Sequence, residues 1–179
     1  MDDRLAERLR ALRVERGLSL QELADLSAIS RATLSRIENG EVSPTAQTLG
    51  ALASVYALTI SCLLAPVERR FAPLIAREQQ SVWRDPRHGF VRHIVSPPSG
   101  ALSAEIIRCE LAPHQSISYE KPPVMGLEHH LTMLSGQLTL SVEGETYRLK
   151  AGDCLRYRLF GPSRFETGRS AASYLIVLA

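Results

Sequence analysis

The sequence predicts an α+β protein with two domains, a five-helix domain followed by an all-β barrel. Apolar residues recur at helical spacing up to about residue 66. After about residue 78, short β-like runs alternate with turn residues. The segment between these regions follows neither pattern. We therefore expect a helical domain at 1–66, a linker at 67–78 and a β-barrel at 79–179.

Capping and spacing patterns place the first two helices. Residues 3–16 repeat apolar side chains at helical spacing, and Gly17 ends that segment. Ser19 and Glu22, three residues apart, form a capping box at the start of a second helix. The apolar residues of the two helices are Leu5, Leu9, Leu12 and Val14, then Leu20, Leu23, Ala24 and Leu26.

Three further helices are expected before residue 66. The chain turns at Ala28-Ile29, and Ser30 caps a third helix that Asn39-Gly40 ends. Ser43-Pro44 predicts the start of a fourth helix with proline at its first position. Residues 59–64 can form a short fifth helix. The apolar faces are Leu34 and Ile37 in the third helix, and Leu49, Leu52, Ala53 and Tyr56 in the fourth.

The second half of the chain is read as a series of short strands separated by turns. Ser135-Gly136 and Gly152-Asp153 are two of the separating turns. Several short strands at regular spacing predict a β-sandwich or a small barrel. The expected strands are 90–95, 102–112, 130–134, 137–143, 146–149, 154–159 and 173–178.

Composition and charge give only broad limits. The net charge is +2, which alone says little about nucleic acid. The three cysteines, Cys62, Cys109 and Cys154, are widely spaced and form no CxxC, which is typical of reduced thiols in a cytoplasmic protein. No apolar run approaches the ~20 residues that span a bilayer, and the charged N-terminal segment does not look like a signal peptide. We expect a cytoplasmic protein without a membrane partner.

The start of the third predicted helix carries the polar residues of a DNA-reading segment. In a helix-turn-helix, the first helix crosses the DNA backbone and the second inserts its N-terminal side chains into the major groove. Arginine is the favoured partner of guanine O6 and N7, while serine and threonine suit phosphates. The alternative is that these arginines form only a solvated face. The predicted DNA contacts are Gln21, Ser30, Arg31, Ala32, Thr33 and Arg36.

Residues 8–64 resemble the Cro/C1-type (XRE) helix-turn-helix, a five-helix lambda-repressor-like DNA-binding domain. This chain has Leu20 where many members have glutamine, and Ala28 where many have glycine. The resemblance implies a transcriptional regulator that binds double-stranded DNA. The matching residues are Ser19-Leu20-Gln21-Glu22-Leu23-Ala24, Ser30, Ile37-Glu38-Asn39-Gly40, Ser43-Pro44 and the run from Leu49 to Leu58.

Residues 131–138 and 144–153 resemble the two turn signatures of the cupin family, a jelly-roll barrel, and the resemblance covers most of residues 100–178. Metal-binding cupins hold an ion with two histidines and a glutamate from the first motif and a histidine from the second. Those four positions fall near Pro123 and Met125 and on His129 and Ser163, so at most one carries a metal-binding side chain. The resemblance therefore implies a cupin without a cofactor.

The barrel is expected to hold a small-molecule cavity. Adjacent strand residues point to opposite faces, so His129 and His130 are weak metal candidates, and His129 alone should face inward. Arg108, Arg156 and Arg158 lie in predicted strands. If one of them pointed inward, its charge would need a carboxylate, which an amino acid or organic acid ligand could supply. The alternative is that these arginines are solvated or paired with Glu110 or Glu166. The predicted cavity residues are Met125, His129, Leu131, Met133, Tyr157 and Ser163.

The two resemblances together predict a homodimeric, cytoplasmic transcriptional regulator with no catalytic residues. In this hypothesis the cupin domain dimerises and senses a small molecule, which changes operator affinity. One alternative is a metal-dependent cupin enzyme with an appended helix-turn-helix domain. Another is a DNA-bound dimer that has no effector. A bound iron would favour the first alternative, and the absence of any stabilising ligand would favour the second.

Overall fold

The computed structural model describes residues 3–64, 72–99 and 101–179. Its helices are α1 (Asp3–Glu15), α2 (Leu20–Ser27), α3 (Arg31–Glu38), α4 (Ala46–Tyr56), α5 (Ile60–Leu64) and the short 3-10 helix η1 (Arg77–Gln79). Its strands are β1 (Val82–Arg84), β2 (Phe90–Ser96), β3 (Glu105–Leu111), β4 (Ser116–Tyr119), β5 (Leu127–Val142), β6 (Glu145–Lys150), β7 (Cys154–Leu159), β8 (Ser163–Glu166) and β9 (Ala172–Leu178).

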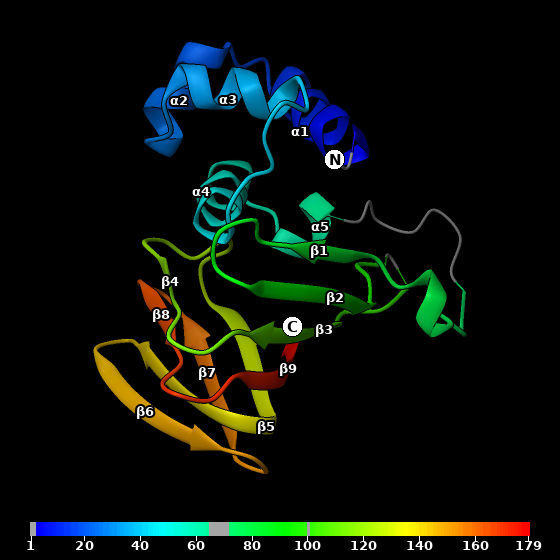
Figure 1. Cartoon of the computed structure of the whole chain (residues 1–179). Helices are drawn as coiled ribbons and strands as arrows, with labels where there is room; N and C mark the ends of the chain where they lie inside the picture. The colour runs from blue at the N-terminus through cyan, green and yellow to red at the C-terminus, as the bar shows by residue number, and fades with distance from the viewer. Residues whose placement is uncertain (1–2, 65–71, 100) are drawn as a thin grey trace.

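The predicted fold class, five helices followed by an all-β jelly roll, is confirmed (Figure 1). The strands follow the antiparallel order β1-β2-β3-β9-β5-β8-β4, and β6 and β7 also pair with β5. Of the predicted linker, residues 67–71 lie outside the described residues, and its last two residues belong to η1. No helix in the described ranges is long and apolar enough to cross a membrane.

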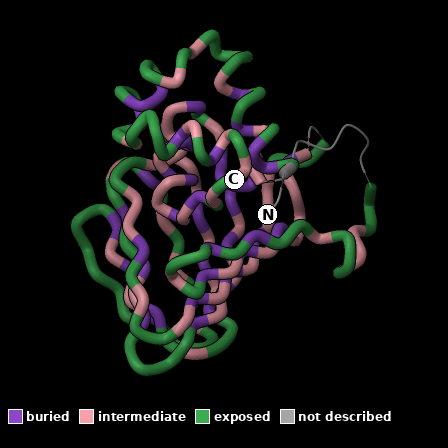
Figure 2. Tube along the Cα trace, turned by 45° about the horizontal axis from the view of Figure 1, so that its top comes forward, coloured by how far each residue is buried: buried purple, intermediate pink, exposed green. Residues whose placement is uncertain are grey.

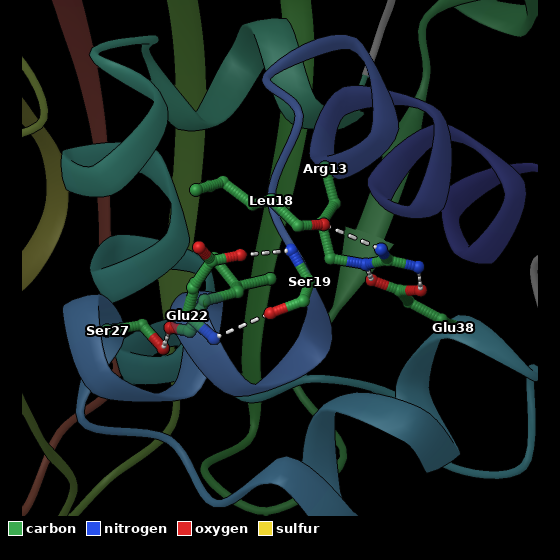
Figure 3. Close-up of polar contacts among 7 residues, drawn as sticks. Arg13, Leu18, Ser19, Glu22, Ser27 and Glu38 are labelled. Atoms are coloured by element: carbon green, nitrogen blue, oxygen red, sulfur yellow. Dashed lines mark hydrogen bonds and ion pairs between the residues drawn. The ribbon is translucent and has the colours of Figure 1, made fainter.

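Side-chain caps set the boundaries of the first helices. Ser19 accepts a hydrogen bond from the Glu22 amide at 3.1 Å, and the Glu22 carboxylate accepts one from the Ser19 amide at 2.7 Å, so the predicted capping box is present (Figure 3). Ala28 adopts a left-handed conformation (φ 57°) that ends α2. Ser30 accepts from the Thr33 amide at 3.1 Å and caps α3 as predicted.

The predicted start of the fourth helix is wrong by two residues. The structure places Ser43 and Pro44 before α4, whose N-cap is Thr45. The Thr45 hydroxyl accepts a hydrogen bond from the Thr48 amide at 3.2 Å. A carboxylate from the barrel, that of Asp85, accepts from the Ala46 amide at 2.6 Å. The helix therefore begins where two acceptors satisfy its free N–H groups, one of them remote in sequence.

The predicted break at Ser135-Gly136 is also wrong, because β5 runs unbroken through it. The start of β5 pairs with β7 and its end with β6 and β8, so one long strand belongs to both halves of the barrel. A bulge near Ser135 bends the strand, and Gly136 follows with φ 76°. A Cβ at Gly136 would overlap the carbonyl oxygen of Ala171, so the close strand packing requires glycine here.

The sequence pattern also misses β1, β4 and β8, and it starts the third strand three residues too early. These three strands have only three or four residues, too few to show an alternating pattern. Leu102 forms only an isolated bridge with Ser99, and regular pairing begins at Glu105.

The buried residues of the helices and the barrel form one core cluster. Figure 2 shows buried segments in both parts of the chain. Helix α4 lies between the other long helices and the barrel (Figure 1). On the barrel side, Gly50 packs against the ring of Tyr119, which a Cβ would overlap. The Ser54 hydroxyl donates to the carbonyl oxygens of Pro122 at 3.0 Å and Lys121 at 3.2 Å. Helix α4 is therefore docked directly on the barrel.

Candidate DNA-binding face and barrel cavity

The outer face of α3 is polar and open to solvent. Arg31, Thr33 and Arg36 are exposed, whereas Leu34 and Ile37 on the other side of the helix are 1% and 3% exposed. Apolar residues one turn apart anchor the helix and turn the intervening polar residues outward. Ala32 is also exposed, which leaves room for close approach of another surface.

Contacts on this face are local and weak. Arg36 Nε lies 3.5 Å from Glu41 Oε2, and both side chains are more than half exposed. An exposed pair of this kind contributes about 0–1 kcal/mol, so it does not hold the guanidinium in place. Gln21 is exposed and donates a hydrogen bond to Asp25 Oδ1 at 2.9 Å. The hydroxyls of Ser30 and Thr33 lie 2.8 Å apart and share a hydrogen bond.

An ion pair fixes α3 to the first helix. Arg13 Nε and Nη2 donate to the two carboxylate oxygens of Glu38 at 2.7 and 2.8 Å (Figure 3). Arg13 also donates to the Leu18 carbonyl at 2.8 Å, which ties the same side chain to the segment before α2. The hydrogen bond with Glu38 raises the pKa of Arg13. This pair sets the orientation of α3, and the sequence analysis missed it because its members lie 25 residues apart.

A cavity of about 50 Å³ lies between the barrel and the helices. Gly50 of α4 and Ile60 of α5 line it from the helical side, and the strands supply most of the remaining lining. Of the six predicted cavity residues, His129 and Ser163 line it.

The positions of the other predicted cavity residues differ. Met125 is 66% exposed, so its predicted inward position is wrong; it lies in the turn before β5. Leu131 and Met133 are buried on the inner face of β5 but fill the barrel core instead of lining the cavity. Tyr157 also does not line it, but its hydroxyl bonds to His129. The cavity reaches only the first residues of β5, because apolar side chains pack the barrel beyond them.

His129 is a buried, neutral side chain that points inward. Its Nδ1 lies 3.0 Å from the Tyr157 hydroxyl, while its Nε2 is buried without a hydrogen-bond partner among the described residues. Burial, and secondarily the charge of Arg92, lowers the pKa of His129 to about 3. Burial also raises the pKa of Tyr157.

His130 points to the opposite face, where its Nε2 lies 2.8 Å from a carboxylate oxygen of Glu128. The two histidines therefore cannot share an ion. Within residues 3–64, 72–99 and 101–179, no three His, Cys, Asp or Glu residues form a group that could hold a metal.

The three arginines considered in the sequence analysis do not reach the cavity. Arg108 pairs with Glu110 at 3.0 Å, Arg158 pairs with Glu128 at 3.0 Å, and Arg156 is exposed. The arginine that does line it is Arg92 in β2, which the sequence analysis missed.

Arg92 could have been found from the alternation in β2. Phe90 and Ile94, two residues before and after it, are both buried apolar residues, so the period of two places Arg92 on the same inner face. Arg92 is 8% exposed, and its Nε has no hydrogen-bond partner among the described residues.

Comparisons with known proteins agree with this architecture. The family model described as a helix-turn-helix domain matches residues 4–63. The HTH-type transcriptional regulator SutR of Escherichia coli (strain K12) is 30% identical over 159 residues, which cover 86% of this chain and 81% of SutR.

Several solved structures of other proteins cover nearly the whole chain. An HTH_3 family transcriptional regulator from Vibrio cholerae has a TM-score of 0.78 at 26% identity, covering 98% of this chain and 94% of that one. Hydroxypropylphosphonic acid epoxidase from S. wedmorenis has a TM-score of 0.50 at 18% identity, and the match covers 97% of this chain and 95% of that one. This likeness concerns the fold alone. The extent of the match to SutR shows that this chain belongs to the HTH-type transcriptional regulators, with a helix-turn-helix domain at residues 4–63 that is followed by a jelly-roll barrel.

Proposed function

We propose that this protein binds a two-fold operator in double-stranded DNA as a homodimer, and that a small molecule in the barrel changes its operator affinity. The observation that carries the proposal is the polarity of α3. Its guanidinium groups at positions 31 and 36 are exposed, while its apolar side is fixed in the core. The proposed cellular setting is the cytoplasm.

In this proposal α3 enters the major groove with its N-terminal end. Arg31 and Arg36 contact guanine edges, and Ser30 and Thr33 contact phosphates or base edges beside Ala32. Gln21, in the first turn of α2, contacts a phosphate where that helix crosses the backbone. The Arg13–Glu38 ion pair supports this arrangement because it holds α3 in one orientation before DNA arrives.

The dimer follows from the geometry of the operator. One eight-residue helix reads only a few base pairs, so specific binding uses two copies on half-sites about one helical turn, ~34 Å, apart. We assign the dimer contacts to the barrel, because α3 must stay free for DNA. Sedimentation equilibrium at micromolar concentration tests this assignment: a mass twice that of the chain is expected, and a monomer on and off DNA would contradict it.

The link from barrel to DNA passes through α4. This helix lines the cavity through Gly50, and it packs against α2 within the same core. A molecule that binds one placement of α4 better than another shifts the balance between them by that difference in free energy. Coupling of this kind is ~1–3 kcal/mol in known systems.

The proposal assigns no enzymatic activity to the barrel. Two observations support this: the relative SutR is a transcriptional regulator, and most of the four positions that bind metal in other cupins lack a metal-binding side chain here. Only His129 among those positions carries a metal-binding side chain.

The first prediction concerns the reading helix. Arg31→Ala and Arg36→Ala should each weaken specific operator binding by about tenfold to a hundredfold, because a bidentate arginine–guanine contact contributes ~1–3 kcal/mol of discrimination. Fluorescence anisotropy on a duplex selected from a random library measures the change. Binding should also weaken steeply with salt, as phosphate contacts require.

The matched control is Arg169→Ala, which removes the same charge from an exposed turn of the barrel. It should leave operator affinity within about twofold, since it lies outside the proposed contacts. Unchanged affinity in both α3 variants, or an equal loss in Arg169→Ala, would contradict the assignment of α3 as the reading helix.

A further inference from the structure

We infer that the barrel cavity is a binding site for a small carboxylate anion, with Arg92 as its charged partner. The inference rests on the proposed function in one respect, that the barrel senses a small molecule, and it names the chemical class of that molecule. It depends on three features of the described residues: the position of Arg92, a cavity lining without acids, and a second unpartnered nitrogen, which belongs to His129.

Arg92 is a buried charged side chain that has no counterion among the described residues. Its side chain lines the cavity with 8% exposure, its Nε is buried without a hydrogen-bond partner, and no carboxylate of the described residues forms an ion pair with it. Arginine keeps its charge in proteins and carries five donors in a planar fork. Burying such a group alone is unfavourable, and buried charges in folded proteins are normally paired. A ligand that supplies two oxygens would satisfy this fork.

The charge distribution of the cavity favours an anion. Among the described residues that line it, Arg92 and Lys121 are basic and none is acidic. Asp85 and Glu105 are acids at the barrel–helix contact, and both already accept hydrogen bonds. The Asp85 carboxylate accepts hydrogen bonds from the amides of α4 and of its own turn, and Glu105 accepts one from the Thr59 hydroxyl at 2.9 Å. A cationic ligand would meet Arg92 without a compensating carboxylate.

His129 supplies a second polar atom that faces the cavity. Its Nδ1 is taken by Tyr157, and its Nε2 is buried and has no partner in the described part of the chain. The pKa of His129 is lowered to about 3 by burial and by Arg92, so the ring is neutral near pH 7. If the Tyr157 hydroxyl donates to Nδ1, Nε2 carries the proton and donates to an oxygen in the cavity. Ser163, which also lines the cavity, provides a hydroxyl.

The size and lining restrict the rest of the ligand. The cavity volume is about 50 Å³, and the remaining walls are mostly apolar, with Phe90, Ile117 and Leu127 among them. An acid with a short aliphatic chain fits this combination better than a sugar acid or a dicarboxylate. A ligand with a longer chain must displace the part of the lining where Gly50 of α4 packs against Tyr119. The site is therefore in contact with α4, the helix that packs on the barrel.

The test compares butyrate with butyramide, which has nearly the same shape but no charge. Thermal unfolding of the full chain is followed in Tris chloride near pH 7.5, with sodium chloride keeping the ionic strength constant. Millimolar butyrate should raise the melting temperature in a dose-dependent way, because a ligand that binds only the folded state stabilises it. Butyramide and spermidine should not. No shift with acetate, propionate or butyrate, or a larger shift with spermidine, would overturn the inference.

Arg92→Met provides the decisive variant, because methionine fills similar space without a charge. It should melt at or above the temperature of the wild type in the absence of ligand, and it should lose the response to butyrate. Arg108→Met is the matched control, since that arginine pairs with Glu110 outside the cavity and should leave the response unchanged. A full butyrate response in folded Arg92→Met would overturn the inference. If that variant does not fold, Arg92→Lys decides: it keeps the charge, loses the fork and should weaken butyrate binding at least about tenfold.

Operator binding measured on the same preparations separates this inference from the proposed function. Butyrate-linked stabilisation that depends on Arg92 supports the site even if α3 binds no DNA. Intact operator binding without any response to carboxylates overturns the carboxylate site and leaves the regulator assignment in place.

Discussion

Arg92 and His129 are buried side chains of the barrel whose polar nitrogens have no partner among the described residues. Arg92 and His129 are each 8% exposed, and both line the same cavity. Unsatisfied buried polar groups destabilise a fold by about 1–3 kcal/mol each, so a protein that keeps two of them together gives up stability at that place. Such groups are concentrated at functional sites, where a ligand completes their hydrogen bonds. The exposed arginines of α3 differ from these groups, because water satisfies their hydrogen bonds in the free protein and DNA would replace that water on binding.

The lowered pKa of His129 makes stability depend on pH. In the unfolded chain its pKa is ~6.5, and in the fold it is about 3. Below pH 6.5 the unfolded state therefore binds a proton that the folded state does not. The folded state therefore has its full stability above pH 6.5, the pKa of the histidine in the unfolded chain, and it loses stability as the pH falls from 6.5 towards 3. When the pH falls from 7 to 5.5, the free energy of unfolding of the wild type should decrease by about 1 kcal/mol more than that of His129→Gln.

Urea denaturation at the two pH values measures this difference. His114→Asn serves as control, because His114 is exposed and asparagine tolerates its left-handed backbone (φ 57°). The control should follow the wild type. Equal losses in the wild type and His129→Gln would contradict a buried neutral histidine.

At the scale of single residues, the sequence predicts what local rules determine. The capping box of Ser19 and Glu22 and the cap at Ser30 are confirmed, because each depends on residues three apart. The Arg13–Glu38 pair and the α4 contact of Asp85 could not be predicted in the same way, since each joins segments that meet only in the folded chain. Positions of side chains in the cavity depend on the strand pairing, which sequence alone leaves open.

At the scale of elements, β5 shows how a correct pattern can give a wrong boundary. The residues on either side of Ser135-Gly136 alternate as the sequence predicts, and glycine there indicates a turn. The structure uses Gly136 instead to bend one strand from one sheet half into the other (φ 76°). Whether a glycine in an alternating run ends the strand or bends it depends on its neighbours in space, here the backbone at Ala171.

This bend predicts a large effect for one small substitution. Gly136→Ala should destabilise the protein by roughly 3 kcal/mol, because alanine is strained at this φ and its Cβ overlaps the Ala171 carbonyl. Gly144→Ala is the matched control: its φ is 81°, and nothing lies within 4 Å of the added Cβ. The control should cost only about 1 kcal/mol. Chemical denaturation measures the free energy of unfolding of both variants. An equal decrease in the two would show that the close packing at Gly136 does not contribute to stability.

At the scale of the molecule, the helices and the barrel share one core, and α4 docks directly on the barrel. Two hydrogen-bonding acceptors meet the N-terminus of α4, one from its own domain and one from the barrel. The Asp85 side chain is fully buried at this contact, and its negative charge also suits the positive end of the helix. Because α4 lines the cavity and packs against α2, unfolding of either domain exposes surface that the other had covered.

This shared helix predicts that the two domains unfold together and that the Asp85 side chain contributes to their coupling. The wild type should show one calorimetric transition. Asp85→Ala should destabilise the protein by about 2 kcal/mol and give two transitions, because it removes the cap that comes from the barrel. Thr45→Ala removes the cap that α4 receives from its own domain, so it should cost about 1 kcal/mol while keeping one transition. Differential scanning calorimetry of the full chain distinguishes the two variants. A single transition in Asp85→Ala, with a melting temperature equal to that of Thr45→Ala, would mean that the buried carboxylate is only another helix cap, and that the barrel communicates with α3 by a route other than the start of α4.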